Sequence, residues 1–273
     1  MAIEATTGLA TLRAGLRSLG RVVVAFSGGA DSSFLAWVAH DELGPDRALA
    51  VTAVSPSLAP EQRLDCERLA SAWGLRWRPV VTDELADPLY VANDHDRCAR
   101  CKTELMEILQ PVAEAEGATI VLGVNVDDLS DHRPGQDAAA ARGAILPLVA
   151  AGFTKAAVRA TSRQLGLVTW DKPAAACLAS RVPYGTPVTL GTLERVATAE
   201  SGLHRLGFEQ VRVRHYGEAA RIELDVSDLP AALDRRDEVV AAVKAAGYRY
   251  VTLDLEGFRS GNLNPTAPPP PST

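Results

Sequence analysis

Cys177 is the residue whose type and surroundings most directly suggest covalent chemistry. It lies among small residues in a segment that runs from Trp170 to Gly185, and Ser180 and Arg181 follow it closely. A cationic neighbour lowers a thiol pKa and favours the thiolate, which is the form that attacks carbon or phosphorus. We interpret Cys177 as a candidate nucleophile assisted by Ser180 and Arg181. The alternative is a buried thiol that acts as a small apolar side chain.

A glycine-rich turn supplies a second candidate site, formed by Ser27, Gly28, Gly29, Asp31, Ser32 and Ser33. The turn follows a β-branched run and leads into a helical pattern, so its backbone N–H groups and the positive helix end would bind an anion such as a phosphate. It lacks the lysine of a P-loop and the spacing of a dinucleotide fold. The alternative is an ordinary turn capped by Asp31 or Ser32.

Polar residues also follow a later apolar run: Gly123, Asn125, Asp127 and Asp128, then Asp131, Arg133, Pro134 and Gly135. Ligands of open parallel sheets bind beyond the carboxyl ends of the strands, where this stretch and the glycine turn both fall. We therefore expect Gly123, Asn125 and Asp128 to share one crevice with the turn, although the aspartates are also typical of a capped loop.

Arginine and glutamate side chains form a third group. Arg212 and Arg214 alternate with Val211 and Val213, so both guanidinium groups project from one strand face and would clamp a phosphate. Glu200 falls on the apolar stripe of a predicted helix, where a carboxylate needs a partner, and Glu223 lies in the next strand. The group predicts either a charged pocket or a structural ion-pair network.

Cys98 and Cys101 have CxxC spacing with basic residues nearby. A structural zinc site normally has four ligands, and the histidines are scattered, so zinc is weakly supported. A redox pair, an iron–sulfur cluster built with Cys177, and simple packing all remain open.

Up to about residue 168, short β-branched runs that predict strands alternate with stretches that predict helices. Candidate strands are Arg21–Phe26, Ala48–Val54, Arg76–Val81, Thr119–Val124 and Ile145–Leu148. Candidate helices between them are Ser32–Leu43, Pro60–Trp73, Cys101–Glu116 and Thr154–Leu165. This alternation predicts a parallel sheet with helices on both faces.

This alternation of strand and helix patterns ends between Trp170 and Pro187, where we place a domain junction. Beyond it the pattern predicts a helix over Leu190–Leu206, strands over Gln210–His215 and Ala220–Val226, a helix over Leu229–Ala246 and a strand over Tyr248–Leu255. The predicted organisation is therefore an α/β domain (1–170), a junction (171–187), a small α+β domain (188–261) and a mobile proline-rich tail (262–273).

Composition limits the class of partner. The 273 residues carry a formal net charge of −6, which provides no global field for nucleic acid or an anionic membrane. No apolar run approaches the roughly 18 residues of a spanning helix. The first residues, which include Glu4, do not have the pattern of a secretory signal. We expect a cytoplasmic protein with a small-molecule site.

The glycine turn matches the SGGxDS signature and resembles the PP-loop ATP pyrophosphatase superfamily. Four stretches in order, SGGADSS, GVNVDD with RPG, DKPAAACLASRVPYGT and RVRHYGEAARIE, resemble the LarE family of ATP-dependent sacrificial sulfur transferases. This family is described as the pyridinium-3,5-biscarboxylic acid mononucleotide sulfurtransferase that serves the nickel-pincer nucleotide cofactor of lactate racemase. The resemblance extends from about residue 10 to about residue 260.

The resemblance implies a PP-loop fold, with ATP bound at the glycine turn and Mg²⁺ near Asp31. It implies that a substrate carboxylate is adenylated, that Cys177 forms a thioester, and that loss of the sulfur leaves dehydroalanine. It also implies that Arg212 and Arg214 hold the substrate phosphate and that Glu200 and Glu223 hold a divalent ion. We further expect the small C-terminal domain to mediate formation of a homo-oligomer.

Several alternatives stay open. One is sulfur transfer through an iron–sulfur cluster on Cys98, Cys101 and Cys177. Others are an amide-forming synthetase or a tRNA-thiolating PP-loop enzyme, and a non-catalytic nucleotide sensor. The acidic charge argues against an RNA substrate.

Overall fold

The computed structural model describes residues 2–129, 143–173 and 176–259. The chain divides into two units: one comprises Met1–Tyr90 and His95–Ala176, and the other comprises Val91–Asp94 and Cys177–Thr273. The predicted proline-rich tail and the stretch from Asp131 to Gly135 lie outside the described residues. None of the described helices combines the length and hydropathy needed to cross a membrane.

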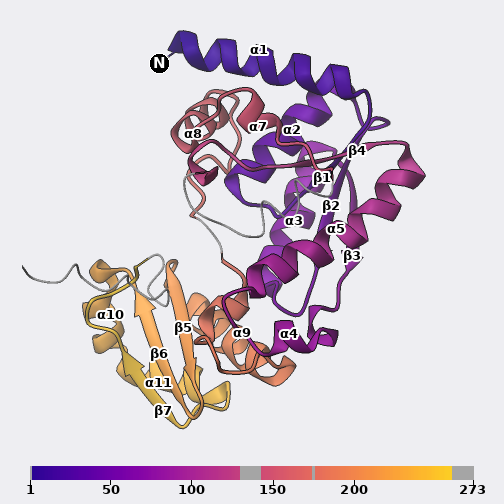
Figure 1. Ribbon diagram of the computed structural model, residues 1–273. Helices are drawn as coiled ribbons and strands as arrows, with labels where there is room; N and C mark the ends of the chain where they lie inside the picture. Colours follow the sequence, from indigo (N-terminus) through magenta and orange to yellow (C-terminus); the bar gives the residue numbers. More distant parts are fainter. Residues whose placement is uncertain (1, 130–142, 174–175, 260–273) are drawn as a thin grey trace, which may run out of the picture. The chain divides into compact units, whose positions relative to one another are not determined.

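The first unit contains a four-stranded parallel sheet (Figure 1). Its strands are β1 (Val22–Ala25), β2 (Ala48–Val54), β3 (Arg76–Val81) and β4 (Thr119–Leu122), and they lie in the order β3-β2-β1-β4. Its helices are α1 (Ala2–Leu19), α2 (Ala30–Leu43), α3 (Pro60–Trp73), α5 (Arg97–Glu116), α7 (Pro147–Ala150) and α8 (Lys155–Gln164), with α4 (Pro88–Val91) at the boundary between units. Short 3₁₀ turns η1 (Glu84–Ala86) and η2 (Asp127–Leu129) follow β3 and β4.

Successive side chains of strand β1 pack into two separate hydrophobic clusters. Val22 and Val24 pack in one cluster with residues of α1, α2, α3, α7 and α8, whereas Val23 packs in another with Met106 and Leu109 of α5. Because successive strand residues point to opposite faces, helices cover both faces of the sheet. The predicted PP-loop α/β class is thereby confirmed.

The second unit is a small α+β module. Its sheet has the order β5-β6-β7, with β5 (Val211–Tyr216), β6 (Ala219–Leu224) and β7 (Tyr250–Leu253). The remaining elements are η3 (Leu178–Arg181), α9 (Leu190–Arg205), η4 (Val226–Asp228), α10 (Leu229–Asp234) and α11 (Arg236–Ala245). Val213 and Ile222 pack against α9 and α11 on one face. The other face carries the charged residues.

Three element predictions need correction. The predicted strand Ile145–Leu148 is an isolated bridge from Ile145 to Val121, because Pro147 begins a helix there. The predicted helix over Leu229–Ala246 is two helices that meet at Arg235. The helix predicted from Cys101 already begins at Arg97, so both cysteines of the CxxC pair lie in its first turns.

Candidate functional site

The glycine turn joins β1 to α2 and leaves backbone groups available to an anion. Gly28 has φ +69°, and a Cβ at this position would lie 3.0 Å from Cys66 Sγ. Gly29 is the N-cap of α2 and makes no side-chain capping bond. Glycine has no side chain to cap the first N–H groups of this 14-residue helix, and such a helix start can bind phosphate oxygens, while the Asp31 carboxylate contacts its own backbone N–H there.

The serines of the turn hold its shape. The hydroxyl groups of Ser27 and Ser32 lie 3.0 Å apart, and Ser27 N–H also donates to Ser32 Oγ at 3.2 Å. Ser33 is fully buried, and its N–H donates to the Gly29 carbonyl. The structure thus places Ser32 at the turn itself and Ser33 in the core beneath it.

The stretch after β4 meets the glycine turn, as the sequence predicts. Asn125 is buried and donates from Nδ2 to Asp31 Oδ1 at 3.2 Å, while its Oδ1 accepts from the N–H groups of Asp127 and Asp128. A Cβ on Gly123 would lie 2.8 Å from Ser32 Cα, so only glycine allows the end of β4 to approach α2 this closely. Burial raises the pKa of Asp31, and the charge of Lys155 opposes that shift.

Lys172 is a residue of this site that the sequence reasoning missed. Its ammonium group donates to the Gly28 carbonyl and to Asp65 Oδ2, both at 2.9 Å. The turn lacks the lysine of a P-loop, and Lys172 brings a cation to it from the other end of the unit's sequence. Nothing in the spacing of these residues signals the contact, because 144 positions separate Lys172 from Gly28.

Cys66 lies directly behind this turn, but it is a poor nucleophile. Its side chain is fully buried, and burial raises the pKa of its thiol. We assign it a packing role against Gly28.

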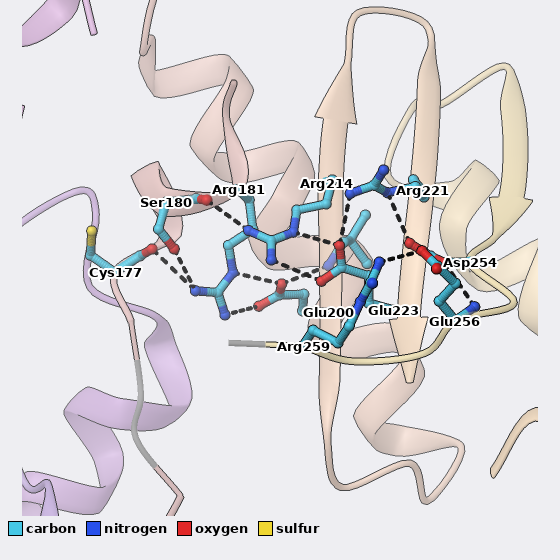
Figure 2. A network of polar contacts seen from close by, with 11 residues as sticks. Cys177, Ser180, Arg181, Glu200, Arg214, Arg221, Glu223, Asp254, Glu256 and Arg259 are labelled. Carbon is cyan, nitrogen blue, oxygen red and sulfur yellow. Dashed lines mark hydrogen bonds and ion pairs between the residues drawn. The ribbon is translucent and has the colours of Figure 1, made fainter. Parts of the chain in front are cut away.

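In the second unit, Arg181 connects Cys177 to a buried ionic cluster (Figure 2). Its Nη1 donates to the Cys177 carbonyl at 3.1 Å and to Ser180 Oγ at 3.0 Å. Its Nε and Nη2 donate to the two oxygens of Glu200 at 2.9 and 3.0 Å. Glu200 also accepts from Val213 N–H at 2.8 Å, which ties η3 to α9 and β5.

The partner of Glu200 differs from the sequence expectation. The sequence grouped Glu200 with Arg212 and Arg214, whereas Arg181 is the guanidinium that it binds. Arg214 instead makes a two-bond pair with Glu223 at 3.0 and 2.8 Å and donates to the Ser180 carbonyl at 2.9 Å. Glu223 also pairs with Arg221. Cys177, Ser180 and the predicted charged pocket therefore belong to one network.

Arg212 lies in this network near Glu200 and Glu223, whose charges partly offset those of Arg181 and Arg214. It is 7% exposed and stacks on Phe258, with its guanidinium carbon 4.5 Å from the ring centre. Its guanidinium group makes no hydrogen bond or ion pair with the described residues. Burial, together with the charges of Arg181 and Arg214, lowers the pKa of Arg212 to about 10. A buried cation beside two other arginines favours the binding of an anion.

The carboxylates of the network are saturated by these arginines. Both oxygens of Glu200 and both of Glu223 accept hydrogen bonds from guanidinium groups. Among the described residues, no group of three or more His, Cys, Asp or Glu side chains has an arrangement that would hold a metal ion. The divalent-ion role of Glu200 and Glu223 stays a prediction.

Cys98 and Cys101 lie in the first unit, at the start of α5. Cys98 is exposed, and the Cys101 thiol lies 3.7 Å from Glu84 Oε1. Their spacing of three residues puts them on one side of the helix. The cluster hypothesis needs both of them to join Cys177 and stays a prediction.

An open pocket of about 600 Å³ lies on the other face of β5. Its lining includes Thr189, Thr192, Glu194, Arg195, Thr198 and His215. Burial lowers the pKa of His215, whose Nδ1 lies 3.1 Å from the Tyr248 hydroxyl. This pocket is distinct from the arginine network, because Arg212 and Arg214 project from the opposite side of the strand.

Comparison with known proteins identifies relatives over nearly the full length. An uncharacterized protein of Synechocystis is 47% identical over 94% of this chain and 96% of the relative. The pyridinium-3,5-bisthiocarboxylic acid mononucleotide synthase of Lactiplantibacillus plantarum is 40% identical over 95% of each chain. An uncharacterized protein of Methanocaldococcus jannaschii is 24% identical over 88% of this chain and 91% of the relative. No protein-family model matches the chain.

Proposed function

The chain belongs to the LarE family, together with the pyridinium-3,5-bisthiocarboxylic acid mononucleotide synthase, and from this premise we propose that it is an ATP-dependent sulfurtransferase. It acts on pyridinium-3,5-biscarboxylic acid mononucleotide and converts a carboxylate of that substrate into a thiocarboxylate. The sulfur comes from Cys177. The product belongs to the synthesis of the nickel-pincer nucleotide cofactor of lactate racemase.

The observation that carries this proposal is the bond from Arg181 to the Cys177 carbonyl. Through Arg181, the residue that donates sulfur is part of the same buried network as Arg212 and Arg214. A substrate phosphate that neutralises Arg212 is thus bound beside Cys177. Arginine is well suited to this task, because its planar donors match phosphate oxygens two at a time.

ATP binds at the glycine turn of the first unit. The N-terminus of α2 and the positive φ of Gly28 suit close approach of phosphate oxygens, and Lys172, which is paired with Asp65, holds the Gly28 carbonyl in place. Asn125 and Asp128 belong to the adjoining polar edge. The role of Ser27 and Ser32 is to keep the turn in its bent form.

Mg²⁺ fits this edge through Asp31. Magnesium is usually held by one or two carboxylates and by substrate phosphates, so it does not require a preformed group of three protein ligands. Asp31 is half-buried and lies near the glycine turn and Asp128. Bound there, the ion supplies charge neutralisation for the triphosphate.

The reaction has three balanced steps. The substrate carboxylate attacks the α-phosphorus of ATP, which releases pyrophosphate and forms an acyl-adenylate. The Cys177 thiolate attacks the acyl carbon and releases AMP, so that a thioester joins protein and substrate. A base then removes the Cys177 α-proton, the Cβ–S bond breaks, and the sulfur leaves with the substrate as a thiocarboxylate while dehydroalanine remains in the chain.

An isotope experiment tests the adenylation. Substrate carrying ¹⁸O in its carboxylates is incubated with ATP, Mg²⁺ and the protein, and the nucleotide products are analysed by mass spectrometry. The proposal predicts AMP that contains one ¹⁸O atom. Unlabelled AMP, or release of ADP and phosphate instead, would contradict it.

A further inference from the structure

We propose that the Cys177 carbonyl oxygen is an oxyanion site, in which Ser180 N–H and Arg181 promote loss of the Cys177 α-proton. This inference rests on the proposed function and deepens its last step. It makes Arg181 a catalytic residue for carbon–sulfur cleavage, where the sequence had suggested that it activates the thiol.

Two donors converge on this one carbonyl. Ser180 N–H donates to Cys177 O at 2.9 Å, and Arg181 Nη1 donates to the same oxygen at 3.1 Å. Both donors are fixed by the local fold, because Cys177 is the N-cap residue of the 3₁₀ turn η3 that contains them. A backbone N–H combined with a charged donor is the composition of a strong oxyanion site.

The surroundings of Arg181 strengthen its effect on the oxygen. The residue is 7% exposed, and its two bonds to Glu200 aim the remaining nitrogen at Cys177. Water contributes little screening at a buried position, so a charge there interacts more strongly than at the surface. Glu200 acts as a positioning residue in this scheme, since Val213 N–H holds it in turn.

The thiol itself lies on a different side of Cys177. Figure 2 shows the sulfur pointing away from the Arg181 guanidinium, while the carbonyl oxygen points toward it. The geometry therefore directs the cation to the backbone carbonyl, where charge develops when the α-proton is lost.

Elimination needs this stabilisation because a peptide α-proton is a very weak acid. A carboxylate or water base takes the Cα proton, and the electron pair moves into the carbonyl, which places negative charge on Cys177 O. The pair then returns to form the Cα=Cβ double bond while the Cβ–Sγ bond breaks. The sulfur leaves with the electrons of that bond as the thiocarboxylate, so the step requires no oxidant or reductant.

Single-turnover mass spectrometry of the intact protein tests the inference. With ATP, Mg²⁺ and saturating biscarboxylate mononucleotide, it separates unreacted protein, the thioester adduct and dehydroalanine, while AMP is measured in parallel. For R181K we expect AMP and adduct to form at nearly the wild-type rate and the adduct to decay about 100-fold more slowly, which is typical for loss of one oxyanion donor. R236K, an exposed arginine of α11, is the matched control and keeps wild-type decay.

E200Q provides a second variant in case R181K does not fold. In this variant an amide nitrogen faces a guanidinium nitrogen, so Arg181 is no longer oriented toward the Cys177 carbonyl. We expect the adduct to decay more slowly while AMP formation continues. The inference would be overturned if the adduct decayed at the wild-type rate in both variants. It would also be overturned if the rate of AMP formation fell by the same factor as the rate of adduct decay. If the wild-type protein itself forms neither adduct nor dehydroalanine, the proposed function fails instead.

Discussion

Lys172 donates a 2.9 Å hydrogen bond to the carbonyl of Gly28, across 144 positions of sequence. A second bond at 2.9 Å joins it to Asp65. The two bonds fix the glycine turn from its carbonyl side, and the charge of Lys172 is paired with that of Asp65. Lys172 therefore holds the backbone of the turn that leads into α2.

We expect Lys172→Met to weaken ATP binding. The substitution removes the bond that holds the Gly28 carbonyl and takes one cationic partner from Asp65, so the turn is less well fixed and the KM for ATP should rise several-fold. AMP formation at varied ATP measures this effect, with Lys244→Met on exposed α11 as the control. An unchanged KM would remove Lys172 from the nucleotide site.

Gly28→Ala should impair the turn itself. The positive φ is unfavourable for alanine by about 1 to 2 kcal/mol, and the new Cβ would press on Cys66 Sγ at 3.0 Å. Urea unfolding should show a lower free energy of unfolding, and binding measurements should show a weaker affinity for ATP. Gly15→Ala is the matched control, because α1 leaves open space around Gly15 and alanine favours a helix. Equal behaviour of the two variants would contradict the account of the turn.

Arg212→Met should stabilise the protein while it removes anion binding. Burial lowers the pKa of Arg212 to about 10 in the fold, well below the value of a free guanidinium group, so its charge disfavours folding below pH 10. We expect the free energy of unfolding at pH 7 to rise by about 1 to 2 kcal/mol, less than the pKa shift alone implies because the contact with Phe258 is lost. Inorganic phosphate should stabilise the wild type more than Arg212→Met, because the variant keeps only the glycine turn as an anion site.

The pH dependence of this difference provides an independent check. A base whose pKa is lowered by folding disfavours the folded state while it is charged, and this penalty fades as the pH rises from about 10 toward the higher pKa of the unfolded chain. The advantage of Arg212→Met should therefore shrink over that window in urea titrations. If the difference in free energy of unfolding between the variant and the wild type instead grew with pH, the charged form of Arg212 would be stabilised by folding.

Asp31→Asn should separate stability from activity. Burial raises the pKa of Asp31 above 3.8, so its ionised form disfavours folding at neutral pH, and this effect disappears at pH below that value. We expect the variant to unfold at slightly higher urea at pH 7 but to lose most ATP-dependent AMP formation. Retained AMP formation would show that Asp31 does not bind the metal–nucleotide complex.

The strongly patterned parts of the fold were predictable from the sequence. The helix Pro60–Trp73 and the strands Ala48–Val54 and Arg76–Val81 have the predicted bounds, because periodicity and terminal Pro or Gly residues define them locally. Helix α1 was missed, although Leu12 and Leu16 show its buried stripe. The four-residue spacing of these two leucines before Arg21 is the local signal that indicates this helix.

The pairings within the site were harder to predict. Alternation along β5 correctly put Arg212 and Arg214 on one face, and the buried stripe of α9 correctly indicated that Glu200 needs a partner. That the partner is Arg181, and that Lys172 reaches Gly28, depends on tertiary contacts. No local pattern encodes which of several arginines meets a given carboxylate.

The most direct test of the account is the mass of the intact protein after one turnover with ATP, Mg²⁺ and pyridinium-3,5-biscarboxylic acid mononucleotide. Sacrifice of Cys177 predicts loss of the mass of H₂S, and peptide mapping should assign that loss to Cys177 with formation of thiocarboxylate product. Thiocarboxylate product from a protein whose Cys177 is unchanged would contradict it and identify another source of sulfur.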